Sequence, residues 1–316
     1  MEPRHAAAHV EHFERHGWVL IERLLSETEI GEALPGLFEL YPSVEQFHAG
    51  GDARAAPFQA EAASPANRGE DPRFRPLQFA GLKEFPFIDL ALNRLPLHPA
   101  IIAVAEDLLR TRDVRLYQAE TFAKYSGVTQ YDQPFHADYT NHVMLPPRRD
   151  GRFRQIQLFL FLSDVTAEHG PTRIVSRTLT DDTPLIDLAF PRARVSSERH
   201  AAWEAAAQSA VGPRGSLLVY SADVVHRGTE MRIERGGRFF FNLAYRVADA
   251  DWIGGNPWPR KGIAPGWVPL VESLGLRQLE ALGFPPPGHA YWDADTLAAT
   301  AARYPKLDVA PWRAVL

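Results

Sequence analysis

The feature that most constrains the fold of this chain is the motif His136-Ala137-Asp138, which is followed much later by His226. On a β-strand, residues i and i+2 point to the same face, so we expect His136 and Asp138 to face one side of a strand together. Two imidazoles and one carboxylate are the ligand set of a mononuclear non-haem iron(II) centre, and they leave three positions of an octahedral metal open. The fold must then bring His226 beside the motif from a neighbouring strand.

Arg238 is the second constraint, because it follows His226 in a segment, residues 238–246, that alternates between two kinds of side chain. Phe239, Phe241, Leu243 and Tyr245 share one face, and Arg238, Phe240, Asn242 and Ala244 share the other. An arginine that faces a polar interior needs an anionic partner, since an unpaired buried charge is costly. A bidentate pair with a carboxylate satisfies it, which predicts a ligand with a terminal carboxylate, such as 2-oxoglutarate. Arg232 and Arg235 are rivals, but they lie in a glycine-containing turn that is predicted to be solvated.

Strand-like segments separated by turns occupy the middle of the chain, at residues 114–122, 133–140, 155–162, 216–220 and 238–246. In the first of these, Val114, Leu116, Gln118, Glu120 and Phe122 are expected to share one inward face. The pattern predicts a mainly β chain with flanking helices, built as a double-stranded β-helix: a jelly-roll, cupin-like barrel.

Helices and loops are expected around these strands. We expect a helix at residues 5–16. A capping box at Ser26 to Glu29 predicts the start of a second helix, and Pro99 predicts the start of a third. Residues 43–75, which are rich in Ala, Pro, Gly and charge, predict a long surface loop. We expect one domain over residues 1–316, with a core of about 10–246 and a C-terminal arm, 247–316, that packs on the barrel and has one helix near 271–282.

Composition excludes several classes of protein. The chain has 316 residues, is 45% hydrophobic and 23% charged, and carries a formal net charge of -5, so nothing favours nucleic acid or a membrane surface as partner. No apolar run approaches the ~20 residues of a membrane helix, and the first residues lack the apolar core of a secretory signal. The absence of cysteine excludes disulfides and thiolate metal sites. We expect a cytoplasmic protein with a small-molecule substrate; its oligomeric state stays open.

Several stretches resemble one known family, the phytanoyl-CoA dioxygenase (PhyH)-like iron(II)/2-oxoglutarate-dependent oxygenases. They are residues 13–20, 135–139, 160–166 and 170–175, together with His226 and Arg238, and the resemblance covers roughly residues 10–246. It implies iron(II) held by His136, Asp138 and His226, 2-oxoglutarate paired with Arg238, and O2 as oxidant. The implied reaction is oxidation of a C–H bond of a small molecule, most simply hydroxylation, in secondary metabolism, with release of succinate and CO2.

Further residues are candidates for binding. Lys124 matches a lysine that is common in the family, and Gln118, Gln157 and Thr172 are expected beside the co-substrate. Tyr139 and His142 are candidate substrate contacts. The competing interpretations are a solvated strand end for Lys124, ordinary buried amide hydrogen bonding for the glutamines, and a loop position for His142.

Two other function classes remain open. The first is a cofactor-independent metalloenzyme of the cupin type, which would not need Arg238. The second is a non-catalytic jelly-roll binding protein that has kept the three metal ligands, against which the presence of Arg238 argues.

Overall fold

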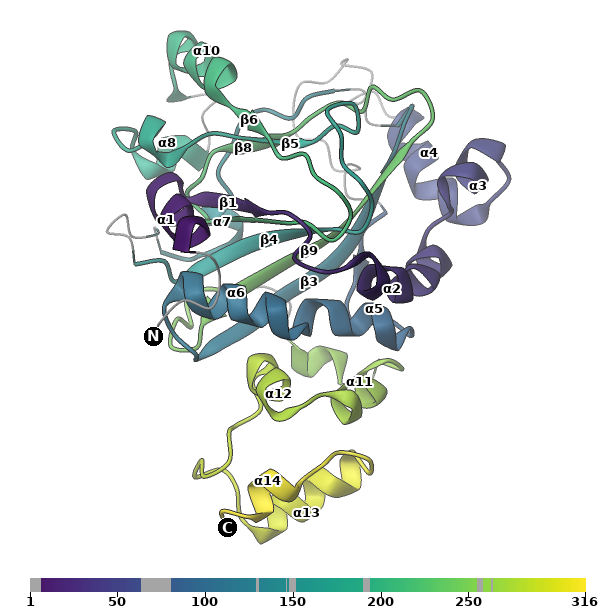
Figure 1. The fold of residues 1–316 in the computed structure, drawn as a ribbon, viewed down its shortest axis with the longest axis vertical. Coiled ribbons are helices and arrows are strands. Elements are labelled where there is room, and N and C mark those ends of the chain that lie inside the picture. Colours follow the sequence, from purple (N-terminus) through teal and green to yellow (C-terminus); the bar gives the residue numbers. More distant parts are fainter. Residues whose placement is uncertain are drawn as a thin grey trace.

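Two antiparallel sheets form the centre of the computed structural model, which describes residues 7–63, 81–128, 131–145, 147, 152–189, 194–254, 258–262 and 264–316. The larger sheet has the strand order β1-β7-β4-β9-β3-β2 and the smaller one β6-β5-β8. Figure 1 shows the smaller sheet above the larger one. The larger sheet consists of β1 (Trp18–Ile21), β2 (Lys83–Glu84), β3 (Val114–Tyr125), β4 (Gln155–Phe161), β7 (Leu217–Tyr220) and β9 (Gly237–Val247), and the smaller of β5 (Thr172–Ile174), β6 (Gln208–Ser209) and β8 (His226–Gly228).

Helices contain more of the described residues than strands do, so the expectation of a mainly β chain is wrong in its proportions. The N-terminal half contributes α1 (Ala7–His16), α2 (Glu27–Leu40), α3 (Val44–Ala49), η1 (Ala53–Ala55), α4 (Ala56–Ala63), α5 (Leu90–Arg94), η3 (Leu95–Leu97), α6 (Pro99–Leu109) and α7 (Tyr139–His142). The C-terminal half contributes η4 (Arg177–Leu179), α8 (Leu185–Ala189), α10 (Ser197–Ala206), η5 (Trp258–Lys261), α11 (Trp267–Ser273), α12 (Leu276–Leu282), α13 (Ala294–Arg303) and α14 (Ala310–Arg313).

The main hydrophobic core lies between the larger sheet and the helices that cover its outer face, among them α2, α5 and α6 (Figure 1). On β9, the face formed by Phe239, Phe241, Leu243 and Tyr245 belongs to this core, whereas Arg238, Phe240 and Asn242 line a cavity on the other side. The expected alternation is therefore confirmed from Arg238 to Leu243, whereas Ala244, which was expected on the inner face, belongs to the main core, and one face of β9 carries polar groups.

Strand β3 departs from the expected single face, because its register against β9 shifts between Leu116 and Gln118. Val114 and Leu116 belong to the helix-covered core, but Gln118, Glu120 and Phe122 line the inner cavity. A β-bulge adds one residue to a strand and so exchanges the two faces beyond it. The prediction that all five residues share a face is wrong at this point, and the bulge is the reason that Gln118 points inward.

The predicted surface loop at residues 43–75 is also wrong within the described part of the chain, because α3, η1 and α4 occupy residues 44–63. Residues 64–75 lie outside the described residues. The capping box is confirmed: the Ser26 hydroxyl accepts from the Glu29 backbone N–H, and the Glu29 carboxylate accepts from the Ser26 N–H. A second capping box begins α3 at Ser43, which explains how a polar, alanine-rich stretch forms a helix there.

Polar contacts, among them three made by Trp258, Gln278 and Arg277, join the C-terminal segment to the larger sheet and its helices. Trp258 Nε1 donates to the Leu116 carbonyl at 2.7 Å, and Gln278 Nε2 donates to the Leu97 carbonyl at 2.8 Å. Arg277 forms an ion pair with Glu106 on α6, with Nε and Oε1 2.7 Å apart. In its described part the segment has four α-helices and the 3-10 helix η5, and not the single helix expected; α13 and α14 lie farthest from the sheets (Figure 1).

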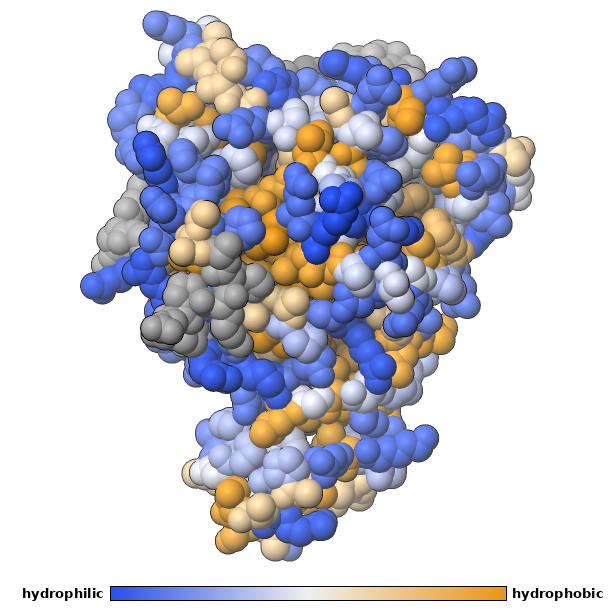
Figure 2. Space-filling model, in the orientation of Figure 1, coloured by the Kyte–Doolittle hydropathy of each residue, from blue (hydrophilic) through white to orange (hydrophobic). Residues whose placement is uncertain are grey.

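Hydrophobic residues gather in the middle of the face shown in Figure 2, over the region where Figure 1 places β1 and β4, with hydrophilic residues around them. Among the residues that the structure describes, no helix has both the length and the apolar character needed to span a bilayer.

Candidate metal centre and its cavity

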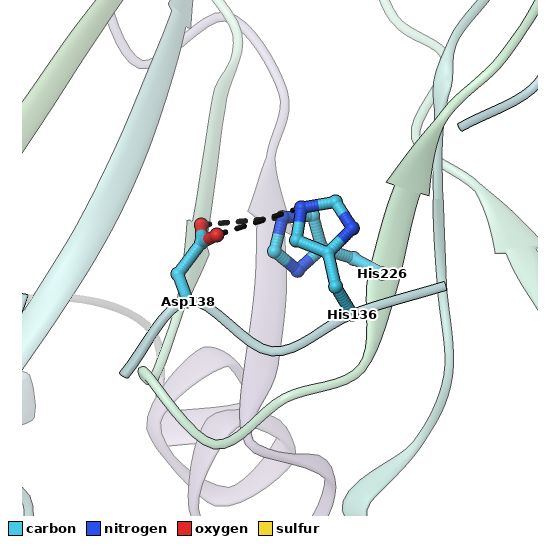
Figure 3. A group of neighbouring side chains, drawn as sticks. All are labelled: His136, Asp138 and His226. Atoms are coloured by element: carbon cyan, nitrogen blue, oxygen red, sulfur yellow. Dashed lines mark ion pairs between the residues drawn. The ribbon is translucent and has the colours of Figure 1, made fainter. Parts of the chain in front are cut away.

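His136, Asp138 and His226 come together at one point. Their candidate ligand atoms all lie within 4.8 Å of one another. His226 Nε2 is 3.3 Å from Asp138 Oδ2, and His136 Nε2 is 3.5 Å from Asp138 Oδ1. Figure 3 shows both imidazoles turned toward the carboxylate. The structure thus gathers the three side chains that the sequence marked as metal ligands.

A short antiparallel bridge between His136 and His226 causes this convergence. The His136 backbone N–H donates to the His226 carbonyl at 3.0 Å, and the His226 N–H donates to the His136 carbonyl at 2.9 Å. The predicted strand at 133–140 is wrong, because His136 makes only this isolated bridge. Asp138 has helical backbone angles (φ -84, ψ -2) and precedes α7. A bend after the bridge, and not strand alternation, turns the carboxylate toward the imidazoles.

Hydrogen bonds orient both imidazoles in the same way. His136 Nδ1 lies 2.9 Å from the Pro134 carbonyl, and His226 Nδ1 lies 3.1 Å from the Val224 carbonyl. A carbonyl can only accept, so each Nδ1 carries the proton and each Nε2 presents a lone pair. This arrangement of the second ring nitrogen is usual for histidines that bind metals. The donor set of two Nε2 atoms and one carboxylate fits iron(II).

Asp138 is held in its ionised form. Burial alone would raise the pKa of Asp138, but the His226 and His136 imidazoles outweigh burial and hold the pKa of this carboxyl well below its usual value. The Tyr220 hydroxyl lies 3.2 Å from Asp138 Oδ2 and 2.9 Å from Gln157 Oε1. It therefore connects the Asp138 carboxylate to β4 of the larger sheet. A carboxylate with a lowered pKa, next to two imidazole Nε2 atoms, is suited to a divalent cation.

A cavity of about 300 Å³ contains the three residues and lies on the inner side of the larger sheet. Arg238 lines it and is 2% exposed, with its Nε and Nη1 lacking any hydrogen-bond partner among the described residues. Its Cζ lies 4.6 Å from the centre of the Phe240 ring. Burial lowers the pKa of Arg238 to about 9. A buried guanidinium with unused donors indicates that an anion belongs in this cavity.

Lys124 lies directly opposite Arg238 in the β3–β9 pair and lines the same cavity. Burial, and then the neighbouring Arg238 charge, lower the pKa of Lys124 to about 7. The competing interpretation of a solvated strand end is wrong, because the side chain is buried. An anionic ligand would favour the charged forms of both side chains, whose pKa values are lowered by burial in its absence.

The other candidate residues divide into two groups. Gln118, Gln157, Thr172 and His142 line the cavity with the triad. The structure does not bring Tyr139 there: its side chain packs with Phe135 and Trp203 in a separate hydrophobic cluster. The rival arginines Arg232 and Arg235 lie outside the cavity, and the Arg232 side chain is 70% exposed.

The sequence did not single out three side chains that the structure places in or beside the triad. Tyr220 ends the strand that was expected at 216–220, where its hydroxyl reaches Asp138. Gln133 accepts from the Gly228 backbone N–H at 2.9 Å, and Phe159 lines the cavity from β4. Tyr220 and Phe159 stand at inward positions of alternating strands, so strand parity could have found them. The role of Gln133 depends on tertiary contact between two loops.

Comparison with known proteins agrees with this geometry. The sequence profile of the family described as phytanoyl-CoA dioxygenase (PhyH) matches residues 13–235. No curated protein matches. Among solved structures, the non-haem α-ketoglutarate-dependent carbocyclase SnoK from nogalamycin biosynthesis is similar, with 17% identity, a TM-score of 0.53, and coverage of 84% of this chain and 95% of SnoK. HygX from Streptomyces hygroscopicus, solved with nickel and 2-oxoglutarate, has 14% identity, a TM-score of 0.50, and coverage of 78% and 88%.

The likeness to SnoK and HygX concerns the fold, and the family profile spans the segment that holds His136, Asp138 and His226. The match covers well over half of the chain. The chain therefore belongs to the phytanoyl-CoA dioxygenase (PhyH) family of iron(II)- and 2-oxoglutarate-dependent oxygenases.

Proposed function

We propose that this protein is an iron(II)- and 2-oxoglutarate-dependent dioxygenase that oxidises a C–H bond of a small organic molecule, most simply by hydroxylation, with release of succinate and CO2. The observation that carries the proposal is one cavity that holds both the His136, Asp138 and His226 group and the Arg238 guanidinium, whose Nε and Nη1 have no hydrogen-bond partner among the described residues. A cofactor-independent metalloenzyme would need the first of these features but not the second.

Iron(II) would be held by Nε2 of His136, Nε2 of His226 and a carboxylate oxygen of Asp138. The carbonyls of Pro134 and Val224 keep the two Nε2 atoms unprotonated, and Tyr220 orients the carboxylate. With 2-oxoglutarate and O2, bound iron would supply the oxidising power that no side chain of this chain has. The protein contributes the geometry of the ligands and a cavity wall that limits water.

The co-substrate would be held by charge. Arg238 Nε and Nη1 are donors without a partner among the described residues, a guanidinium is the group best suited to bind a carboxylate, and Lys124 lies opposite Arg238. Gln118, Gln157 and Thr172 supply neutral hydrogen-bonding groups on the same wall. Gln157 lines the cavity, and its Nε2, which has no hydrogen-bond partner among the described residues, could donate to an anionic ligand.

Fold and substrate class form part of the same proposal. The family implies a double-stranded β-helix, and the two facing antiparallel sheets are compatible with it. We place residues 1–316 in one domain, because residues from both ends of the chain share the main hydrophobic core. SnoK is a carbocyclase of nogalamycin biosynthesis, and HygX has been solved with hygromycin B bound. By analogy with these two proteins, we propose that the small molecule oxidised by this protein is a natural product.

The proposal is tested by titrating 2-oxoglutarate into the anaerobic iron(II) protein while following the visible charge-transfer absorption of the iron–keto-acid chelate. Wild-type protein should develop the band. Arg238→Met should need about 100-fold more 2-oxoglutarate, since truncating one partner of a buried charge pair costs about 2–5 kcal/mol. The matched control Arg232→Met, which removes an exposed arginine, should behave as wild type.

The same variants separate binding from folding. Without ligands, Arg238→Met should unfold at a temperature no lower than wild type, because it removes a buried cation with unpartnered donors. Absence of the band in wild-type protein saturated with iron would overturn the 2-oxoglutarate assignment, leaving a cofactor-independent metalloenzyme or a binding protein. A band that Arg238→Met leaves unchanged would place the co-substrate elsewhere.

A further inference from the structure

A second cavity of about 390 Å³ is lined in part by residues that neighbour, along the chain, those of the cavity with the triad. Its wall is mainly apolar and includes Val143, Leu145, Phe153, Trp252 and Ile253. At two places, neighbouring residues of the chain line different cavities. Tyr220 lines the first cavity and Ser221 the second, and His142 lines the first and Val143 the second. Tyr220, whose hydroxyl donates to Asp138, directly precedes Ser221 in the chain, so the backbone connects the wall of the second cavity to the metal centre.

Gln155 is the polar side chain that distinguishes this cavity. It lies at the start of β4, two residues before Gln157, so the two amides point to the same inner side of the larger sheet. Gln155 is 4% exposed, yet neither its Nε2 nor its Oε1 has a hydrogen-bond partner among the described residues. A buried amide without partners is costly and is normally satisfied by a ligand or an ordered water.

The charges around the cavity are already neutralised or solvated. Asp223 forms a buried ion pair with Arg177, with Oδ1 and Nη2 2.7 Å apart, and Arg154 pairs with Asp249. Arg152 is exposed, so its charge is screened by water. What remains for recognition is apolar surface, the Phe153 and Trp252 rings, and the Gln155 amide.

We propose that this second cavity binds the organic substrate, and that it selects a neutral molecule with an apolar ring and a hydroxyl, carbonyl or amide group that bonds to Gln155. This inference rests on the proposed function, because only an enzyme has a substrate. Binding of the molecule in the cavity does not itself require metal or co-substrate. The cavity is of the size that holds small organic ligands. Gln155 acts here by binding and orienting, and Asp138, His136 and His226 lie in the first cavity.

The test uses three matched probes with the full-length protein and fluorine NMR: neutral para-fluorobenzamide, anionic para-fluorobenzoate and cationic para-fluorobenzylamine. Wild-type protein should bind the benzamide most tightly. Gln155→Leu should weaken it about tenfold, the effect of one buried hydrogen-bonded pair. Gln208→Leu, the same exchange on the exposed strand β6, should change nothing. Gln155→Glu should reverse the preference toward the benzylamine, a result that loss of structure could not produce.

Failure of this inference and of the proposed function can be told apart. Equal benzamide binding by Gln155→Leu and Gln208→Leu, no binding of any probe, or a wild-type preference for a charged probe would overturn the cavity assignment. His226→Ala should lose the 2-oxoglutarate band but keep benzamide binding. If wild type shows no band yet binds the benzamide through Gln155, the proposed function fails while the neutral-ligand cavity stands.

Discussion

At the scale of single residues, the geometry of the metal centre depends on atoms that bind no metal themselves. The Pro134 and Val224 carbonyls fix which imidazole nitrogen carries the proton, and the Tyr220 hydroxyl holds one oxygen of Asp138. Partners of this kind orient ligands and raise their affinity for metal. The candidate ligands could be found from residue type alone, but these partners are chosen by the fold.

Tyr220 permits a direct test. Tyr220→Phe keeps the ring, removes the hydroxyl bond to Asp138, and should lower iron(II) affinity about 10-fold or more. The matched control is Tyr245→Phe, which removes an equally buried hydroxyl that donates to the Pro96 carbonyl in the helix-covered core. Titration calorimetry with iron(II) or manganese(II) should show the loss only in Tyr220→Phe. Equal affinities in both variants would mean that Asp138 is positioned without Tyr220.

Lys124 predicts a pH dependence. Its pKa is lowered to about 7, so at about pH 8 most of the side chain is neutral in the ligand-free protein. A bound carboxylate favours the charged form, so binding of 2-oxoglutarate should take up close to one proton per site. Calorimetry in buffers of different ionisation enthalpy measures this uptake. Lys124→Met should abolish it, and Lys261→Met, which removes a lysine outside the cavity, should not.

Lys124 also makes the stability of the folded protein depend on pH, and the sign is opposite to that of a lysine in an ordinary ion pair. Between about pH 7 and the ordinary lysine pKa of 10.5, the unfolded chain keeps the Lys124 proton and the folded chain has lost it. Stability of the ligand-free protein should therefore gain from Lys124 as pH rises through that window. An uptake of protons that Lys124→Met leaves intact would assign the titration to another group.

At the scale of elements, Arg227 ties three segments together next to the metal centre. It follows His226 on β8, and its Nη2 lies 2.9 Å from both Asp132 Oδ2 and Glu204 Oε2. Its Cζ also lies 4.6 Å from the centre of the Phe135 ring, the residue before His136. One side chain thus links β8, the loop that carries His136, and α10.

Replacing Arg227 by methionine removes its charge but keeps a side chain of similar length. The loop that carries His136 should then be held less firmly. Arg227→Met should lower iron(II) affinity about 10-fold, the lower part of the range for outer partners of metal ligands. Arg173→Met is the matched control, because Arg173 on β5 binds Glu204 and α10 carbonyls but not the loop. Arg227→Lys should recover part of the affinity. Equal metal affinity in Arg227→Met and wild type would show that the backbone bridge alone holds His136.

At the scale of the whole molecule, the C-terminal segment has two attachments: Ile253 pairs with Val143 near the metal centre, and the part from Trp258 onward is attached to the outer helix layer. Arg277 on α12 reaches Glu106 on α6, whose side chain is 1% exposed, and Trp258 and Gln278 add bonds to β3 and η3. Its apolar residues extend the core on the side of the larger sheet opposite the cavity. We expect this segment to support the sheet that carries Arg238 and Lys124.

Arg277→Met should therefore destabilise the protein while leaving ligand binding intact. Breaking a buried ion pair from one side costs about 3–5 kcal/mol, and the partial exposure of Arg277 places the expected loss toward about 2–3 kcal/mol. Arg199→Met, which breaks a largely exposed pair with Asp182, should cost less than about 1 kcal/mol. Chemical unfolding measures both. A drop in 2-oxoglutarate affinity without loss of stability would contradict this separation of roles.

The amino-acid sequence by itself determined the local chemistry. The alternation of Arg238 to Arg246 placed Arg238 inward, and the Ser26 capping box began a helix where expected. Such features depend on residue type and on short spacings, which fix helix caps and strand faces through nearby atoms. The grouping of His136, Asp138 and His226 also followed from the kind of ligand that each side chain can be.

Only the tertiary structure decided how these parts meet. The bulge in β3 sends Gln118 inward, the bend after His136 directs Asp138, and Tyr139 turns into a separate cluster, although each was assigned by strand parity or proximity in the sequence. Backbone pairing between distant segments sets these directions, and one added residue exchanges two faces. The partners Tyr220, Gln133 and Arg227 likewise depend on which segments the fold brings together.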